Sequence, residues 1–177
     1  MATPREIRRR IASIKNTRKI TKAMEVVASV KLRNSRGWIQ AARPYSEKMA
    51  EITRHLCQNI TDKSIPFLYP REVKKIGLVV VSSDKGLCGG FNANVIKKAQ
   101  EFIREHNGTE VTLILLGKKC VEFFKSKKVS ILDKYPDIFF KPNYDDAVKI
   151  SEKIQDYYMS EQIDQLDIMY NKFKSAG

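Results

Sequence analysis

The chain has 177 residues, of which 42% are hydrophobic and 30% charged, and its formal net charge is +13. No apolar run approaches the roughly 20 residues that cross a bilayer, so we expect no direct membrane insertion. Three cysteines without a C-x-x-C pair and two histidines exclude a disulfide framework and a Cys/His zinc site. We therefore expect no metal and no cofactor. The charged first ten residues lack the apolar core of a secretory signal, so we expect the chain to act where it is made.

The positive charge is concentrated in the first third of the chain. Residues 1–56 carry 14 Lys/Arg and 4 Asp/Glu, whereas the remaining residues carry 19 and 16. This asymmetry predicts two parts with different roles.

The first part, residues 1–58, is predicted to form one long helix that begins at a capping box. Thr3 and Glu6 have the required spacing, and Pro4 stands at the first helical position, where its missing N–H is not needed. Apolar residues then recur at spacings of three and four, with one phase slip after Ile14. These seam residues are Ile7, Ile11, Ile14, Ile20, Met24 and Val27, followed by Trp38, Ala41, Tyr45 and Ile52.

A helix from residue 4 to about residue 56 would be about 80 Å long, which is more than a compact domain of this size can cover. Much of it must therefore project. Pro44 removes a backbone donor, so the sequence predicts a kink or break at Arg43-Pro44. A narrow apolar seam on a projecting helix needs a second helix, a partner's cavity or a copy of itself to cover it.

After a turn-rich linker, residues 59–73, the sequence predicts an α/β domain over residues 74–177. Short apolar runs at 76–81 and 111–116 are typical of buried parallel strands, and residues 166–173 are a third predicted strand. Helices are predicted at 92–106, 118–128 and 144–159. Strands that alternate with helices indicate a small parallel sheet of Rossmann type.

The turn between the first strand and the first helix of this domain contains Asp84, Gly86, Cys88, Gly89 and Gly90. In doubly wound folds such a turn binds phosphates, so a nucleotide site is one interpretation. The glycine spacing is G-x-x-G-G rather than G-x-G-x-x-G, and no P-loop sequence is present, so the motif argues against that interpretation. An activated thiol at Cys88 is a second possibility, but no base is positioned beside it in the sequence.

Three segments together resemble the gamma subunit of F-type ATP synthase, and they resemble the bacterial members of that family most. The segments are IKNTRKITKAMEVVASVKLR (14–33), ARPY (42–45) and VVSSDKGLCGGFN (80–92). The resemblance runs in order along the whole chain and covers about the N-terminal three-fifths of a family member. By this comparison, the C-terminal helix of the family's shaft is absent and the α/β domain is incomplete.

The resemblance implies a central rotor shaft without a catalytic site of its own. The N-terminal helix would be half of an antiparallel coiled coil inside a hexamer of alpha and beta subunits, which hold the nucleotide sites. The α/β domain would meet the epsilon subunit and the ring of c subunits, on the cytoplasmic face of the bacterial plasma membrane. Lys85 and Lys97 match basic positions that contact the acidic helix-turn-helix lever of the beta subunit. Met24 lies where the shaft passes close to the same lever, and packing against the absent C-terminal helix is the alternative for this residue.

The alternative from another functional class is a nucleic-acid-binding protein with a basic helical arm, because the same charge would suit phosphates. Such an arm predicts basic residues on one face with aromatic residues for stacking. Arginines and lysines instead surround most of the predicted helix between Arg5 and Lys22. We therefore expect no nucleic-acid partner.

Overall fold

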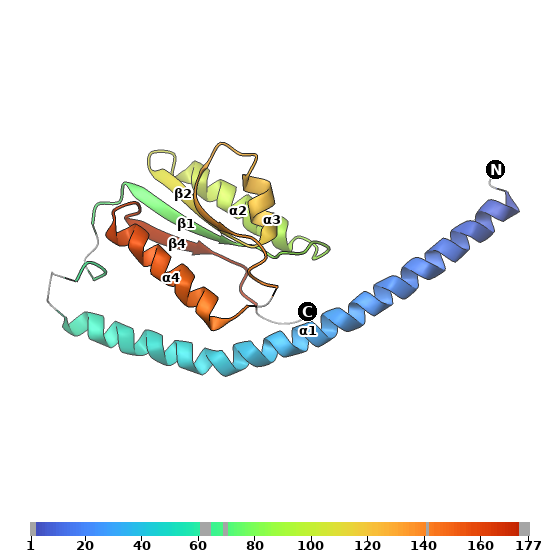
Figure 1. Ribbon diagram of the computed structural model, residues 1–177, viewed down its shortest axis with the longest axis horizontal. Coiled ribbons are helices and arrows are strands. Elements are labelled where there is room, and N and C mark those ends of the chain that lie inside the picture. The colour runs from blue at the N-terminus through green and yellow to red at the C-terminus, as the bar shows by residue number, and fades with distance from the viewer. Residues whose placement is uncertain (1–2, 61–64, 69–70, 141, 174–177) are drawn as a thin grey trace. The chain divides into compact units, whose positions relative to one another are not determined.

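The computed structural model describes residues 3–60, 65–68, 71–140 and 142–173. The chain divides into two compact units, residues 1–62 and residues 63–177. Helix α1 belongs to the first unit, and a four-stranded sheet with three helices belongs to the second (Figure 1). The expected fold class, a long N-terminal helix followed by a small parallel α/β domain, is confirmed.

Helix α1 spans Pro4–Asn59 and begins at the predicted capping box. The hydroxyl of Thr3 accepts a hydrogen bond from Glu6 N at 3.3 Å, and the Glu6 carboxylate accepts one from Thr3 N at 2.8 Å. These two bonds satisfy backbone donors that a bare helix start would leave without partners. Pro4 occupies the first turn, as predicted.

Of the kink or break predicted at Arg43-Pro44, the break is wrong, because α1 continues through Pro44 to Asn59 as one curved helix (Figure 1). A proline removes a single backbone hydrogen bond, and water can bond the released carbonyl on an exposed helix. Thr17, Thr21 and Thr53 also donate their hydroxyls to carbonyls four residues earlier, a pattern that favours helix bending.

The sheet of the second unit has the strand order β3-β2-β1-β4, and all three strand pairs are parallel. Its strands are β1 (Lys75–Val81), β2 (Glu110–Leu116), β3 (Ser130–Tyr135) and β4 (Gln165–Met169). Its helices are α2 (Phe91–Glu105), α3 (Lys118–Phe124) and α4 (Tyr144–Met159). Helices α2 and α3 cover one face of the sheet, and α4 lies on the other (Figure 1).

Strand β3 was not predicted, so the expected three-stranded sheet is wrong. Its sequence, SILDKY, carries Asp133 and Lys134 and has no continuous apolar run, because β3 lies at an edge and is only partly buried. Two other predicted elements end early. Helix α3 stops at Phe124 rather than at Lys128, and β4 stops at Met169 rather than at residue 173.

The core lies between the sheet and helices α2 and α3. Leu78, Val80, Leu113 and Leu115 contribute side chains that are fully buried on this face of the two central strands. Cys120 packs among them, and burial raises the pKa of its thiol. The predicted buried runs of β1 and β2 are therefore confirmed, since each has five consecutive buried residues.

A close approach at Gly117 joins the ends of β1 and β2. Gly117 has φ +98°, and a Cβ atom there would lie 2.3 Å from the carbonyl oxygen of Ser82. Ser82 is itself held in place by two hydrogen bonds. Its N–H donates to Leu116 O at 2.9 Å, and its hydroxyl accepts from Cys120 N at 2.9 Å. Only glycine fits this backbone conformation and this contact.

We predict that Gly117→Ala destabilises the α/β unit by at least about 3 kcal/mol, because both the φ angle and the contact with Ser82 are unfavourable for a side chain. Urea unfolding followed by near-UV circular dichroism measures this change. Gly108→Ala is the matched control, since nothing lies within 4 Å of its Cβ position. Equal losses in the two variants would contradict the proposed requirement for glycine.

Candidate functional site

The turn from β1 to α2, residues 82–90, lies at the carboxyl end of β1. Strand β1 lies between β2 and β4, so the order of the strands along the chain reverses direction at this point of the sheet. Ligands and partners of parallel α/β sheets commonly meet this position. The turn contains Lys85 and all five residues of the predicted motif turn, whereas Lys97 lies on the outer surface of α2.

Asn92, in the first turn of α2, organises this turn. Its side-chain oxygen accepts hydrogen bonds from Ser83 N at 2.9 Å and from the Ser83 hydroxyl at 3.0 Å. Its side-chain nitrogen donates to Lys85 O at 3.2 Å and lies 3.2 Å from the Cys88 sulfur. The backbone of Lys85 is therefore held in place while its side chain is exposed.

Asp84 fixes the turn to two neighbouring segments. One carboxylate oxygen accepts a hydrogen bond from Lys118 N at 3.0 Å, and the other accepts one from Phe139 N at 3.0 Å. Asp84 thereby joins the loop after β1 to the start of α3 and to the loop after β3. Sequence reasoning placed Asp84 in the motif without this role, because both partners are distant in the chain.

The tip of the turn is exposed and has two residues with positive φ. Leu87 has φ +60° and is 93% exposed, and Gly89 has φ +57°. A leucine that is held in this conformation without packing is unusual. The exposed Leu87 side chain therefore gives the tip of the turn an apolar surface that a partner could cover.

The two basic residues that the resemblance singled out differ in their surroundings. In the described part of the chain, no ion pair involves Lys85. The Lys97 ammonium lies 3.9 Å from Glu101, which pairs more closely with Lys98 at 2.7 Å. Hydrogen bonding to Lys98 is the main cause that lowers the pKa of Glu101. Lys85 is thus the freer of the two for an outside carboxylate.

The nucleotide interpretation gains no support from the turn. The Ser83 N–H is already bonded to Asn92, and the Ser83 carbonyl accepts from Lys119 N at 3.1 Å. Cys88 is exposed, and its contacts are the Asn92 amide and the Lys85 carbonyl rather than a base. Sequence reasoning missed the role of Asn92, although an amide two residues after Gly90 and inside the first helical turn was the available signal.

The second candidate surface is the seam of α1. Each of its predicted members has an exposed side chain in unit 1, with Met24 48% and Ile20 61% exposed. The step from Ile14 to Ile20 rotates the chain by about 600°, so the seam before the slip and the seam after it face different sides of an ideal helix. The seam is therefore asymmetric around the axis of α1.

Comparison with known proteins identifies the family. The sequence profile of the family described as ATP synthase matches residues 3–177. The ATP synthase gamma chain of Trichlorobacter lovleyi is 38% identical over 178 residues, which cover 99% of this chain and 62% of that protein. The gamma chain of Glaesserella parasuis is 41% identical over 98% of this chain and 61% of its own length.

A solved structure supports the same fold. The central stalk and c-ring structure of the Tetrahymena thermophila mitochondrial ATP synthase contains a chain that matches 88% of this chain with a TM-score of 0.62. Its sequence identity is 20%, and the match covers 66% of that chain. This chain spans about three-fifths of the length of the bacterial relatives named above. The chain belongs to the ATP synthase gamma chain family.

Proposed function

We propose that this chain forms the central rotor shaft of an F-type ATP synthase and that it couples rotation to conformational change at nucleotide sites on an alpha/beta hexamer. The observation that carries the proposal is the 56-residue helix α1, whose apolar seam is exposed along its length. A basic helix of this kind suits a partner that surrounds it and presents acidic groups. Family membership supports the same role.

The proposed mechanism is a population shift. A shaft changes the nucleotide affinity of a beta subunit only by contacting its open and closed forms differently. Because of the phase slip, the apolar residues before and after Ile14 face different sides of α1. Rotation of the shaft would therefore bring different side chains to each subunit in turn. Exposed ion pairs contribute only about 0.2 to 1 kcal/mol each, so they can break at every step. We assign no catalytic residue to this chain.

The proposed partners are the alpha and beta subunits, the epsilon subunit and the ring of c subunits. In a full-length subunit, we propose, α1 also pairs with a C-terminal helix as half of an antiparallel coiled coil. No helix among the described residues is both long and apolar enough to cross a membrane. The proposed location is peripheral, on the cytoplasmic face of the bacterial plasma membrane. The family match favours these partners over nucleic acid.

We predict that Met24→Lys weakens binding of this chain to a bacterial alpha/beta hexamer by about tenfold or more, because a buried methionine contributes about 1.5 to 3 kcal/mol. Val26→Lys is the matched control, since Val26 is similarly exposed but lies about 200° around the helix from Met24. Sedimentation velocity with labelled chain measures both affinities. No binding by the unchanged chain would contradict the proposed function, and equal losses would contradict the seam contact.

We predict that Lys85→Glu weakens the same binding more at 50 mM salt than at 500 mM salt, because salt screens an exposed ion pair. Lys97→Glu should have a smaller effect, since Glu101 lies beside Lys97. Lys128→Glu is the control, because it makes the same charge change just before β3, at the amino ends of the strands. A loss at Lys85 that does not depend on salt would indicate a folding defect in the turn and would overturn the contact.

A further inference from the structure

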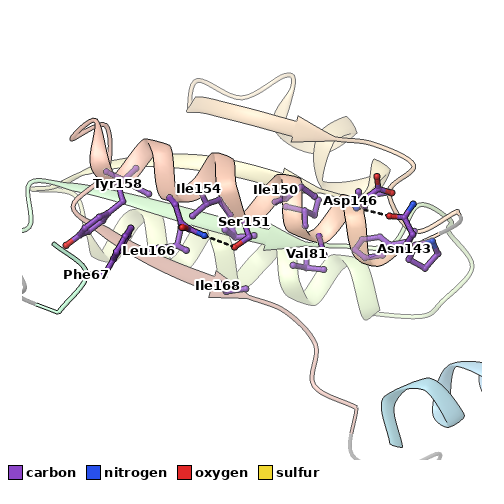
Figure 2. A pocket seen from close by; sticks show the side chains of 18 residues that line it. Phe67, Val81, Asn143, Asp146, Ile150, Ser151, Ile154, Tyr158, Leu166 and Ile168 are labelled. Atoms are coloured by element: carbon purple, nitrogen blue, oxygen red, sulfur yellow. Dashed lines mark hydrogen bonds between the residues drawn. The ribbon is translucent and has the colours of Figure 1, made fainter. Parts of the chain in front are cut away.

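An apolar cavity of about 660 Å³ lies between α4 and the sheet, entirely within the second unit (Figure 2). Figure 2 shows that side chains from α4 and from the strands meet in this space. The walls are mainly aliphatic. Representative lining residues are Val79 and Val81 of β1, Leu116 of β2, Ile150 and Ile154 of α4, and Leu166 of β4.

The cavity is deep at one side and open at the other. At its inner side, Val79 is 3% exposed, Ile150 is 8% exposed and Ile163 is fully buried. At its mouth, Ile168 is 58% and Phe67 is 55% exposed. This gradient describes a concave site rather than a flat apolar surface. Its volume lies within the range of about 300 to 1,000 Å³ that is usual for small-molecule sites.

A polar cluster on β3 fixes one side of α4. The Asp133 carboxylate accepts hydrogen bonds from the hydroxyls of Tyr135 at 2.6 Å and Tyr157 at 3.2 Å, and it pairs with the Lys153 ammonium. Burial raises the pKa of Asp133, but the bonds from Lys153 and Tyr135 outweigh it and leave the pKa lowered. Because Lys153 and Tyr157 belong to α4, this cluster sets the distance between α4 and β3.

Arg71 fixes the C-terminal end of α4. Its guanidinium donates to Tyr158 O at 2.7 Å, lies 2.7 Å from the Asp164 carboxylate and stacks 4.3 Å from the centre of the Tyr158 ring. Phe67 also stacks on Tyr158, with 5.3 Å between the two ring centres. Helix α4 cannot move onto the sheet without breaking these bonds, so the space between them persists.

Three polar side chains on the cavity wall, those of Asn143, Ser151 and Gln155, take part in hydrogen bonds within the chain. Asn143 caps α4 by accepting from Asp146 N at 2.7 Å, and Gln155 donates to Ser151 at 3.3 Å. Asp146 is the charged side chain on the lining, and its carboxylate disfavours an anionic ligand. Because most of the lining side chains are apolar, the cavity offers a ligand mainly apolar contact.

We propose that this cavity is a binding site for an uncharged, mainly hydrocarbon small molecule. Filling it would restore van der Waals contacts that Ile150, Val79 and Leu166 lack on the cavity side. A small molecule is favoured over a protein segment because the deepest walls are almost completely buried and the opening is fixed by the two polar clusters. The proposal is independent of the proposed rotor function.

Isoleucine methyl NMR on the full chain tests the proposal. The probe is N-phenyl-1-naphthylamine, which is neutral and apolar, and the reporters are the δ methyl groups of Ile150, Ile154 and Ile168. We expect these signals to shift with one shared, saturable dissociation constant, while Ile20 and Ile52 on α1 do not saturate. No saturable shift at the cavity, or one confined to α1, would overturn the proposal.

Two comparisons make the test specific. The anionic analogue 8-anilino-1-naphthalenesulfonate has the same ring system and should bind at least tenfold more weakly, and equal affinity would overturn the neutral ligand class. Cavity signals that shift with protein concentration before any probe is added would show that a second copy of the chain fills the site, which also overturns the proposal.

Substitutions complete the design. Val81→Phe fills the cavity from the sheet and should weaken probe binding at least tenfold, whereas Val73→Phe, at an exposed position before β1, should not change it. Ser151→Phe fills the cavity from α4 and serves as the second variant if Val81→Phe does not fold. Unchanged probe binding in a folded filling variant would overturn the proposal.

Discussion

Within residues 3–60, no second element covers the apolar seam of α1. The exposure of this seam to solvent is the constraint on which the role of the first unit depends. Ile20, Met24 and Val27 are about half exposed or more, although covering each would contribute about 1.5 to 3 kcal/mol. A helix gains little stability from intrinsic propensity compared with tertiary packing. The seam therefore requires a partner, and the surplus of positive charge favours one with acidic groups.

The second unit differs from the first because its exposed surface includes a rigid turn, residues 82–90 between β1 and α2. Three contacts hold the loop after β1: the Ser82 backbone against Gly117, the Asp84 carboxylate on Lys118 and Phe139, and the Asn92 amide on Ser83. They use the carboxyl ends of β1 and β2 together with the loop after β3. Lys85 is thus carried on fixed backbone, with only its flexible side chain free to reach a partner.

The sequence predicts the elements that have a strong pattern. The capping box at Thr3, the buried runs of β1 and β2 and the periodic helix α4 are all visible without the structure, because each depends on local spacing. Strand β3 is missed because its burial comes from the neighbouring β2 rather than from its own composition. The break at Pro44 is predicted wrongly because a proline removes only one backbone hydrogen bond, and water can replace that bond where the helix is exposed.

The site is predicted less completely than the fold. The motif turn is recognised as a unit, but the partners of Asp84 are 34 and 55 residues away and cannot be read from the spacing. The cavity under α4 is also invisible in sequence, because it results from the positions of Asp133 and Arg71 relative to that helix. Contacts between distant residues determine both features.

Hydrogen exchange along α1, with and without an alpha/beta hexamer, tests most directly whether a partner completes the seam. In the chain alone, the amides between Ile20 and Ile52 should exchange at least tenfold faster than those of β1 and β2, because tertiary packing protects the strands but not α1. Adding the hexamer should slow the α1 amides by at least tenfold and leave the strands unchanged. Strong protection of α1 in the chain alone, or no change on adding the hexamer, would contradict the account.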